Sequence, residues 1–333
     1  AKSYPSVQAL KDDEPLLAMT SIDAAISKAQ VLIFAPRIRK TGQDIKIEIN
    51  SKFKDAASNL KKGCIVVYAL GTGFGGNSEN TSLLEHVTGF KVGKNLAYFY
   101  YPLSKLSNHN SFIGSFDGQE NEILIKLLSN KTQKNFLTIV ASEYFHAINI
   151  LKNFSERTSI LEICKFAKDN KTKSDLNYDK IGELFLDEMI DGLYDLRALN
   201  NSFEGATSLT YLINASIKGI DSYVKKLVDE IRLILKKNEL KASRTKILLL
   251  WTLDSFEMKG EKIEKLSELE NKLKDYIGDV ESVHQPIDNF HSDKTIILVT
   301  CSKYDFDYVM KNNKDHEVII LKANPLCELV SQK

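Results

Sequence analysis

A single long amphipathic segment, residues 206–237, constrains the fold of this chain more than any other stretch. Its apolar residues recur at helical spacing, and charged residues fall mostly between them. The apolar positions are Leu209, Leu212, Ala215, Ile220, Val224, Leu227, Ile231 and Ile234. A helix of roughly 30 residues is about 45 Å long, which exceeds the width of a small domain. We expect this helix to be a spine between two bodies of structure, and its apolar stripe to pack the central region or a second subunit.

Apolar runs alternate with helical patterns on both sides of the spine. The predicted strands are 31–35, 64–70, 95–101, 247–252, 295–300 and 317–321. The predicted helices beside them are 21–28, 45–60, 78–87, 263–276 and 304–312, and residues 120–167 and 178–199 also have a helical pattern. Alternation of this kind is typical of parallel sheets with helices on their faces.

These patterns predict an α/β protein with two Rossmann-like domains, the first one truncated, joined by a central helical region with the long spine helix. We place the first domain at 1–131, the central region at 132–241 and the second domain at 242–333.

Composition and spacing exclude several classes of function. Lys and Arg number 45 against 44 for Asp and Glu, so no overall positive field would draw the protein to nucleic acid or an anionic membrane. No apolar run approaches about 18 residues, and residues 1–13 lack the pattern of a signal peptide. The four cysteines form no CxxC pair and the six histidines no ligand pair. We expect a cytoplasmic protein with reduced thiols, no membrane segment and no metal.

Several segments in collinear order resemble one family. They are SIDAAI at 21–26, VLIFAPR at 31–37, LKKGCIVV at 60–67, LAYFYYP at 96–102, FIGS at 112–115, DLRAL at 195–199, and the strand, helix and strand of 296–321. Together they resemble the nucleotide-sugar dehydrogenases of the UDP-glucose and GDP-mannose type, over nearly the whole chain. The resemblance implies a homodimer through the central helices.

The family's catalytic residues are not matched. It oxidises a sugar alcohol to a carboxylate with NAD through a cysteine thioester, which uses a thiolate, a lysine for the oxyanion and a glutamate for the water-dependent step. The position of the glutamate holds Leu103, and the position of the nucleophile holds Asp191. The family has a lysine beside an aspartate; here Tyr194 stands at the lysine position, and the aspartate is retained as Asp195. The lysine of the central helix falls on Asn149 in one register, or on Asn153 beside Lys152 in another, and a further lysine is lost near Leu253.

The resemblance also concerns the NAD site. Residues 1–13 match sequence that lies beyond the family's opening GxGxxG turn, so either the protein lacks this phosphate site or the sequence begins after it. A second glycine motif, GTGFGG at 71–76, follows an apolar strand and precedes a helix, as a dinucleotide fingerprint does. The next strand, however, ends without an acidic residue for a ribose.

Three interpretations of this motif stay open. It is a flexible loop, a dinucleotide fingerprint, or an anion or nucleotide contact made by Gly71, Gly73 and Gly76 with Arg37. Arg37 is otherwise a solvated arginine. The residues Asp187, Glu188 and Asp191 are expected to form a solvated acidic helix face, and the run 98–101 a strand with period-two burial.

We therefore expect a catalytically inactive relative of the nucleotide-sugar dehydrogenases. It would act as a binding or scaffolding protein, with itself as partner, without a cofactor, and with at most weak nucleotide or UDP-sugar binding. Tyr101, Asp195 and Arg197 are the candidate substrate contacts. The alternative is an active NAD-dependent UDP-sugar dehydrogenase with diverged catalytic residues.

Overall fold

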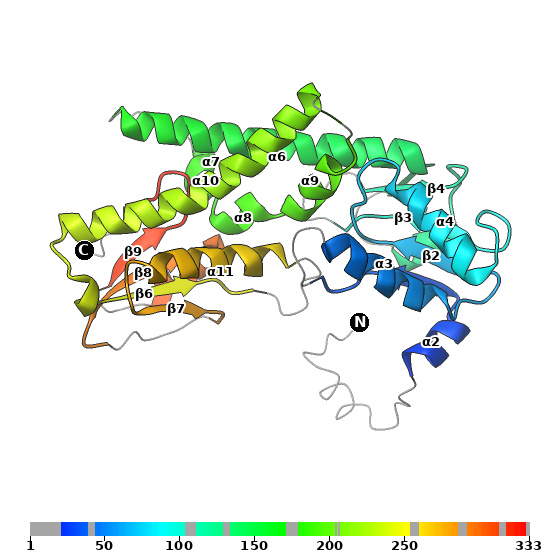
Figure 1. Ribbon diagram of the computed structural model, residues 1–333, viewed down its shortest axis with the longest axis horizontal. Helices are drawn as coiled ribbons and strands as arrows, with labels where there is room; N and C mark the ends of the chain where they lie inside the picture. Colours follow the sequence, from blue (N-terminus) through cyan, green and yellow to red (C-terminus); the bar gives the residue numbers. More distant parts are fainter. Residues whose placement is uncertain are drawn as a thin grey trace.

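The computed structural model describes residues 21–38, 44–103, 111–128, 134–170, 179–203, 205, 207–253, 260–285, 292–312 and 318–330. Figure 1 draws two sheets toward opposite ends of the long axis, with helix α6 extending across the top of both. The predicted fold class is confirmed, because two mainly parallel sheets are joined by long helices.

The first sheet has the strand order β1-β2-β3-β4-β5, and only β3 and β4 are antiparallel. Its strands are β1 (Val31–Phe34), β2 (Ile65–Tyr68), β3 (Ala97–Tyr100), β4 (Ser111–Ser115) and β5 (Lys134–Thr138), and its helices are α2 (Ile22–Lys28), α3 (Asp44–Ala57), α4 (Gly76–Thr88) and α5 (Glu122–Leu127). All four residues of β2 are buried, because alternate side chains enter apolar clusters on opposite faces of the sheet.

Two expectations for this region are wrong. The stretch 120–167 is not continuously helical, because β5 interrupts it and pairs in parallel with β4. Residues 98–100 are all buried instead of alternating, since β3 lies inside the sheet with both faces covered. The division of the chain at residues 131 and 241 stays a prediction, although β5 joins the first sheet beyond residue 131.

Five helices form the middle of the chain: α6 (Ile139–Asp169), α7 (Asp179–Glu183), α8 (Leu186–Ile190), α9 (Leu193–Asn200) and α10 (Ser208–Lys237). The hydroxyls of Thr138 and Thr207 cap α6 and α10 by accepting backbone N–H bonds. The two long helices approach closely at Gly219, where a β-carbon would lie 2.9 Å from Cγ2 of Thr158. None of the helices in the described ranges is both long enough and apolar enough to cross a bilayer.

The second sheet has the order β10-β9-β8-β6-β7, with β10 as its one antiparallel strand. Its elements are β6 (Thr245–Leu250), α11 (Glu261–Lys274), β7 (Val280–Val283), β8 (Thr295–Thr300), α12 (Lys303–Asn312), β9 (Ile319–Lys322) and β10 (Leu329–Val330), after a 3-10 turn at Ala242–Arg244. Its strand order reverses between β6 and β8, since β7 lies on one side of β6 and β8 on the other.

The apolar stripe of α10 is covered within the chain from Ile220 to Ile234. It belongs to the largest apolar cluster, which also takes residues of α6, α8, α9, α11 and the second sheet. Of the two alternatives expected for the stripe, packing of the central region is therefore the one that the structure supports for this part of the helix. Toward the start of α10, Leu212 is 42% exposed.

Leu227→Ala should lower the free energy of unfolding by about 2–5 kcal/mol, because it opens a cavity in this cluster where Leu227 is fully buried. Leu233→Ala is the matched control on the same helix, since Leu233 is 44% exposed; its effect should stay within about 0.5 kcal/mol. Urea unfolding measures both changes. Equal effects of the two substitutions would contradict the burial of the stripe.

Candidate functional site

A cavity of about 890 Å³ lies between the first sheet and the middle helices. Its wall consists of Ile45, Lys46, Ile49, Asn50, Tyr68, Gly71, Thr72, Phe74, Gly76, Glu79, Asn80, Tyr194, Arg197, Ala198, Asn200, Asn201, Ser202 and Glu264. These residues come from α3, the carboxyl end of β2, the glycine turn and α4, and from α9 and α11. The volume falls within the range of roughly 300–1,000 Å³ that is usual for ligand pockets.

The glycine turn 71–76 is packed against α9. A β-carbon on Gly71 would lie 2.5 Å from Oδ1 of Asp195, and one on Gly73 would lie 1.9 Å from Oγ of Ser202. Gly73 also has a φ of +71°, which disfavours other residues. The N–H of Phe74 donates to Oγ of Ser202 at 2.9 Å. Glycine is required here by close approach to the protein itself, so a bare flexible loop does not describe the turn.

A buried glutamate of α6 caps the helix that follows this turn. The carboxylate of Glu143, which is 6% exposed, accepts the backbone N–H groups of Gly75 at 3.1 Å and Asn77 at 3.3 Å, and the side-chain amide of Asn77 at 2.7 Å. The hydroxyl of Tyr98 donates to Oδ1 of Asn77 at 2.6 Å. Two of the backbone donors at the start of α4 that would hold a phosphate, those of Gly75 and Asn77, are therefore engaged by a carboxylate. This turn does not fit the pyrophosphate of a dinucleotide.

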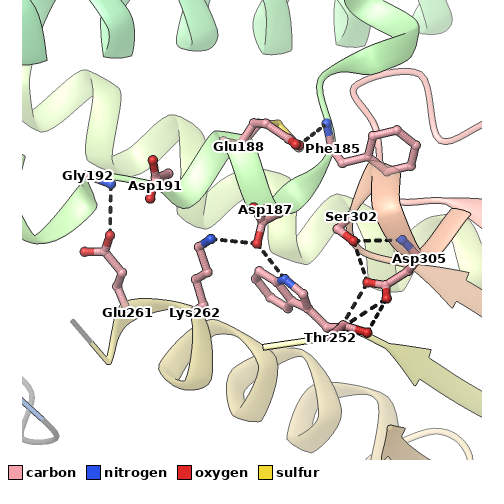
Figure 2. Close-up of polar contacts among 12 residues, drawn as sticks. Phe185, Asp187, Glu188, Asp191, Gly192, Thr252, Glu261, Lys262, Ser302 and Asp305 are labelled. Atoms are coloured by element: carbon pink, nitrogen blue, oxygen red, sulfur yellow. Dashed lines mark hydrogen bonds and ion pairs between the residues drawn. The ribbon is translucent and has the colours of Figure 1, made fainter. Parts of the chain in front are cut away.

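A second buried glutamate, Glu261 of α11, holds the start of α9. Its carboxylate accepts the N–H groups of Gly192 at 2.9 Å and Tyr194 at 2.5 Å, and Figure 2 shows the contact with Gly192. Beside it, Nη1 of Arg157 donates to the carbonyl of Asp191 at 2.7 Å. Burial lowers the pKa of Arg157. Residues 191–194, which resemble the family's nucleophile segment, are thus bonded through their backbone to Arg157 of α6 and to Glu261 of α11.

A histidine and an aspartate meet beneath Gly71. Nε2 of His146 lies 3.8 Å from Oδ2 of Asp195, and the two side chains are 11% and 0% exposed. The ring of Tyr100 meets the imidazole edge-on, and burial raises the pKa of Tyr100. On α6 the side chain shown to meet the retained aspartate is therefore His146. Asn149 and Asn153, the positions inferred from the resemblance, are instead joined to each other through the bond from Nδ2 of Asn153 to the carbonyl of Asn149.

The structure brings some of the predicted site residues together and leaves others apart. Gly71, Gly76, Tyr194 and Arg197 line the cavity, whereas Gly73 packs against α9 and Asp195 lies beneath the turn. Among the described residues, the wall does not include Arg37, Tyr101, Leu103, Asn149 or Asp191. The hydroxyl of Tyr101 accepts a bond from Nζ of Lys134 at 2.8 Å, and the carbonyl of Arg37 accepts one from Nζ of Lys52 at 2.7 Å.

The carboxyl ends of β6 and β8, where the second sheet reverses its strand order, are filled by the protein's own side chains. Asp187 accepts bonds from Nε1 of Trp251 at 2.8 Å and Nζ of Lys262 at 2.6 Å (Figure 2). Asp305 accepts bonds from the backbone N–H of Thr252 and from the hydroxyls of Thr252 and Ser302. Ligands usually bind at such a reversal, but here the polar groups already satisfy one another.

The expectation of a solvated acidic face is therefore wrong for Asp187 and Glu188, and it stays a prediction for Asp191. Asp187 is paired with buried groups, and Glu188 accepts the backbone N–H of Phe185 at 3.0 Å. Burial also raises the pKa of Glu188. Asp187 faces the second sheet because α8 lies across the carboxyl ends of its strands, where Leu186 and Asp187 donate their N–H groups to Ala323 and Cys301.

Four residues of the site were missed by the sequence patterns: Glu143, His146, Glu261 and Glu264. Their partners lie 49 to 69 residues away in the chain, as in the bonds from Gly75 to Glu143 and from Gly192 to Glu261. The one local signal is the spacing of Glu261 and Glu264, which puts both on one face of α11.

Glu143→Gln should lower the free energy of unfolding by about 1–3 kcal/mol, because the buried N–H groups at the start of α4 lose a charged acceptor. Glu162→Gln, an exposed position on the same helix, serves as the control and should change stability by less than about 0.5 kcal/mol. Chemical denaturation compares the variants. Unchanged stability in Glu143→Gln would show that the carboxylate does not support this helix start.

Solved structures of nucleotide-sugar dehydrogenases resemble this chain over most of its length. The UDP-D-ManNAc dehydrogenase from Pyrococcus horikoshii is 13% identical with a TM-score of 0.58, over 95% of this chain and 83% of that one. A UDP-glucose dehydrogenase from Pyrobaculum islandicum is 11% identical with a TM-score of 0.63, over 95% and 81%. The NDP-N-acetyl-D-galactosaminuronic acid dehydrogenase from Methanosarcina mazei Go1 is 16% identical with a TM-score of 0.52, over 92% and 76%.

At the level of sequence the comparisons are negative. No protein-family model matches the chain, and no curated protein matches it either. At these identities the structural similarity concerns the fold alone. The chain has the fold of the nucleotide-sugar dehydrogenases.

Proposed function

We propose that this chain is a cytoplasmic binding or scaffolding protein that takes a nucleotide or nucleotide sugar in its cavity and does not carry out thioester oxidation. The observation that carries the proposal is the cavity itself, which is open to a ligand and has no cysteine among its wall residues. The fold shared with UDP-sugar dehydrogenases supports the class of ligand. The shared fold does not imply that this chain has the glutamate and thiol chemistry of those dehydrogenases.

The state of the thiols supports the absence of thioester chemistry. All four cysteines of the chain are buried, and none lines the cavity. Burial raises the pKa of the Cys64 and Cys301 thiols, and it raises that of Cys327 to about 11. A buried thiol that stays protonated near neutral pH is a poor nucleophile. Asp191, at the position expected for the nucleophile, cannot form a thioester.

The cavity wall supports weak binding of a polar ligand. Its hydroxyl and amide groups come from residues such as Asn50, Thr72, Asn201 and Ser202, and Tyr68 and Tyr194 add ring surfaces. Its two cationic side chains, Lys46 and Arg197, are each paired with a carboxylate. We expect a dissociation constant near about 1 mM for UDP-glucose, equivalent to about −4.1 kcal/mol.

The alternative function is an active dehydrogenase with diverged residues, and the pair of His146 and Asp195 favours it. An imidazole close to a carboxylate is a common proton acceptor in enzymes, and here Nε2 of His146 lies 3.8 Å from Oδ2 of Asp195. This function requires NAD to be bound by residues other than the glycine turn. Formation of NADH from UDP-glucose or UDP-N-acetylmannosamine, and its loss in His146→Gln, would establish the alternative.

Asn50→Trp should abolish the heat of binding of UDP-glucose in calorimetry, because Asn50 is exposed on α3 and its replacement fills the cavity without entering the core. Ile47→Trp is the matched control on the same helix, since Ile47 is 67% exposed and is not part of the wall. The control should bind like the unaltered protein. Binding that survives Asn50→Trp would place the ligand elsewhere, and no binding at several millimolar would leave only a scaffolding role.

We also propose a homodimer through the central helices. The buried part of the spine cannot supply the contact, but the first halves of α6 and α10 carry exposed apolar side chains. These are Val140, Tyr144, Phe145, Ile148, Tyr211 and Leu212. Helices α6 and α10 pack against each other, and an exposed apolar surface on such a helix pair is uncommon on a monomer unless it is covered.

Ile148→Glu should therefore convert a dimer into a monomer of 37.6 kDa at micromolar concentration, as measured by light scattering. The substitution places a charge in the proposed contact, where Ile148 is 57% exposed in one chain. Ile22→Glu introduces the same change on α2, away from the central helices, and should leave the dimer intact. A monomeric unaltered protein would disprove the proposal.

A further inference from the structure

The less exposed of the two cationic side chains in the cavity wall, Arg197, already has an acidic partner from another element. Nη1 of Arg197 on α9 donates to both carboxylate oxygens of Glu264 on α11, at 3.0 and 3.3 Å. Both side chains are 28% exposed, so solvent screens this pair only in part. Nη1 of Arg197 is therefore occupied by a carboxylate, and a phosphate that approaches the guanidinium must lie beside the negative charge of Glu264.

The other positive groups near the cavity offer less. Lys46 pairs with Glu79 at 2.8 Å, and both side chains are more than half exposed, where such pairs contribute little. The starts of α4 and α9, whose N–H groups would favour an anion, are occupied by Glu143 and Glu261. Each positive feature of the described wall thus faces a carboxylate of the chain.

The rest of the wall has the chemistry that uncharged polar ligands need. Four asparagines line it, together with a threonine, a serine and two tyrosines: Asn50, Asn80, Asn200, Asn201, Thr72, Ser202, Tyr68 and Tyr194. Thr72, Asn80 and Ser202 already make hydrogen bonds within the chain, so a ligand would depend mainly on the other three asparagines. Amides and hydroxyls donate and accept hydrogen bonds, as the hydroxyl groups of a sugar and the amide edge of a base do. A diphosphate accepts hydrogen bonds and adds negative charge to a wall whose cations are neutralised.

We propose that the cavity binds the uncharged part of its ligand, a nucleoside or a sugar with hydroxyl and amide groups, and that Glu264 sets this preference by holding Arg197. The inference rests on the proposed nucleotide binding and names the part of the ligand that the wall recognises. Glu264 acts through Arg197 and is a specificity-determining residue. Removing its charge exposes the guanidinium to a ligand phosphate.

The test compares uridine and UDP by calorimetry in the unaltered protein and in Glu264→Gln. The unaltered protein should bind uridine at least as tightly as UDP. Glu264→Gln should bind UDP about tenfold more tightly, since a charged hydrogen bond to phosphate is gained, and uridine within about twofold of the unaltered protein. The gain for UDP should vanish in Arg197→Gln combined with Glu264→Gln, and it should shrink at high salt.

Glu268→Gln is the matched control, because Glu268 lies on the same helix but pairs with Lys265 and Lys272 outside the cavity. It should leave both affinities unchanged, and melting curves should show that all the variants are folded. The inference is overturned if the unaltered protein binds UDP about tenfold more tightly than uridine, or if Glu264→Gln leaves the ratio of the two affinities unchanged. The proposed function fails separately, when the unaltered protein binds neither molecule.

Discussion

Two buried carboxylates connect the parts of this protein. Glu143 reaches from α6 to the start of α4 in the first unit, and Glu261 reaches from α11 in the second unit to the start of α9. Each is nearly inaccessible to water, so each must be satisfied by donors, and the backbone N–H groups of a helix start are well suited to a negative charge. The cavity lies between the helices that these two contacts position.

The same contacts restrict the chemistry of the cavity. Helix starts that face a cleft are common sites for phosphate, but here both are filled from within the chain. The fold is similar to that of the nucleotide-sugar dehydrogenases, the thiols of this chain are buried outside the cavity wall, and Asp191 stands at the position that the resemblance assigns to the nucleophile. What the wall offers is a set of amides, hydroxyls and rings, with Arg197 held by Glu264. In the proposed function, such a wall recognises an uncharged polar group of the ligand.

The large elements were predictable because periodicity is a local property. The spine appears as α10 at 208–237, and the runs around Val66 and Leu298 form buried parallel strands. The strand β5 was missed because KNFLT is short and is followed at once by helix α6. Packing of the spine against the central region was expected, but the residues that cover it were not predicted, because they come from α6, α8, α9 and α11, which no local pattern places together.

The site was less predictable than the fold. Arg197, a predicted substrate contact, lies in the cavity wall, and so does Tyr194. The approach of His146 to Asp195 was not indicated by the sequence patterns. The roles of Glu143 and Glu261 depend on donors more than 60 residues away. An acidic residue on a helix has the same local signature whether it is solvated or buried, as Asp187 illustrates.

A crystal structure of the protein soaked with UDP-glucose tests the central claim most directly. The account predicts electron density for the uridine or the glucose ring between α3, α4, α9 and α11, with Glu143 and Glu261 still bound to their helix starts. Density for a phosphate at the N-terminus of α4 or α9, with the glutamate displaced, would contradict it.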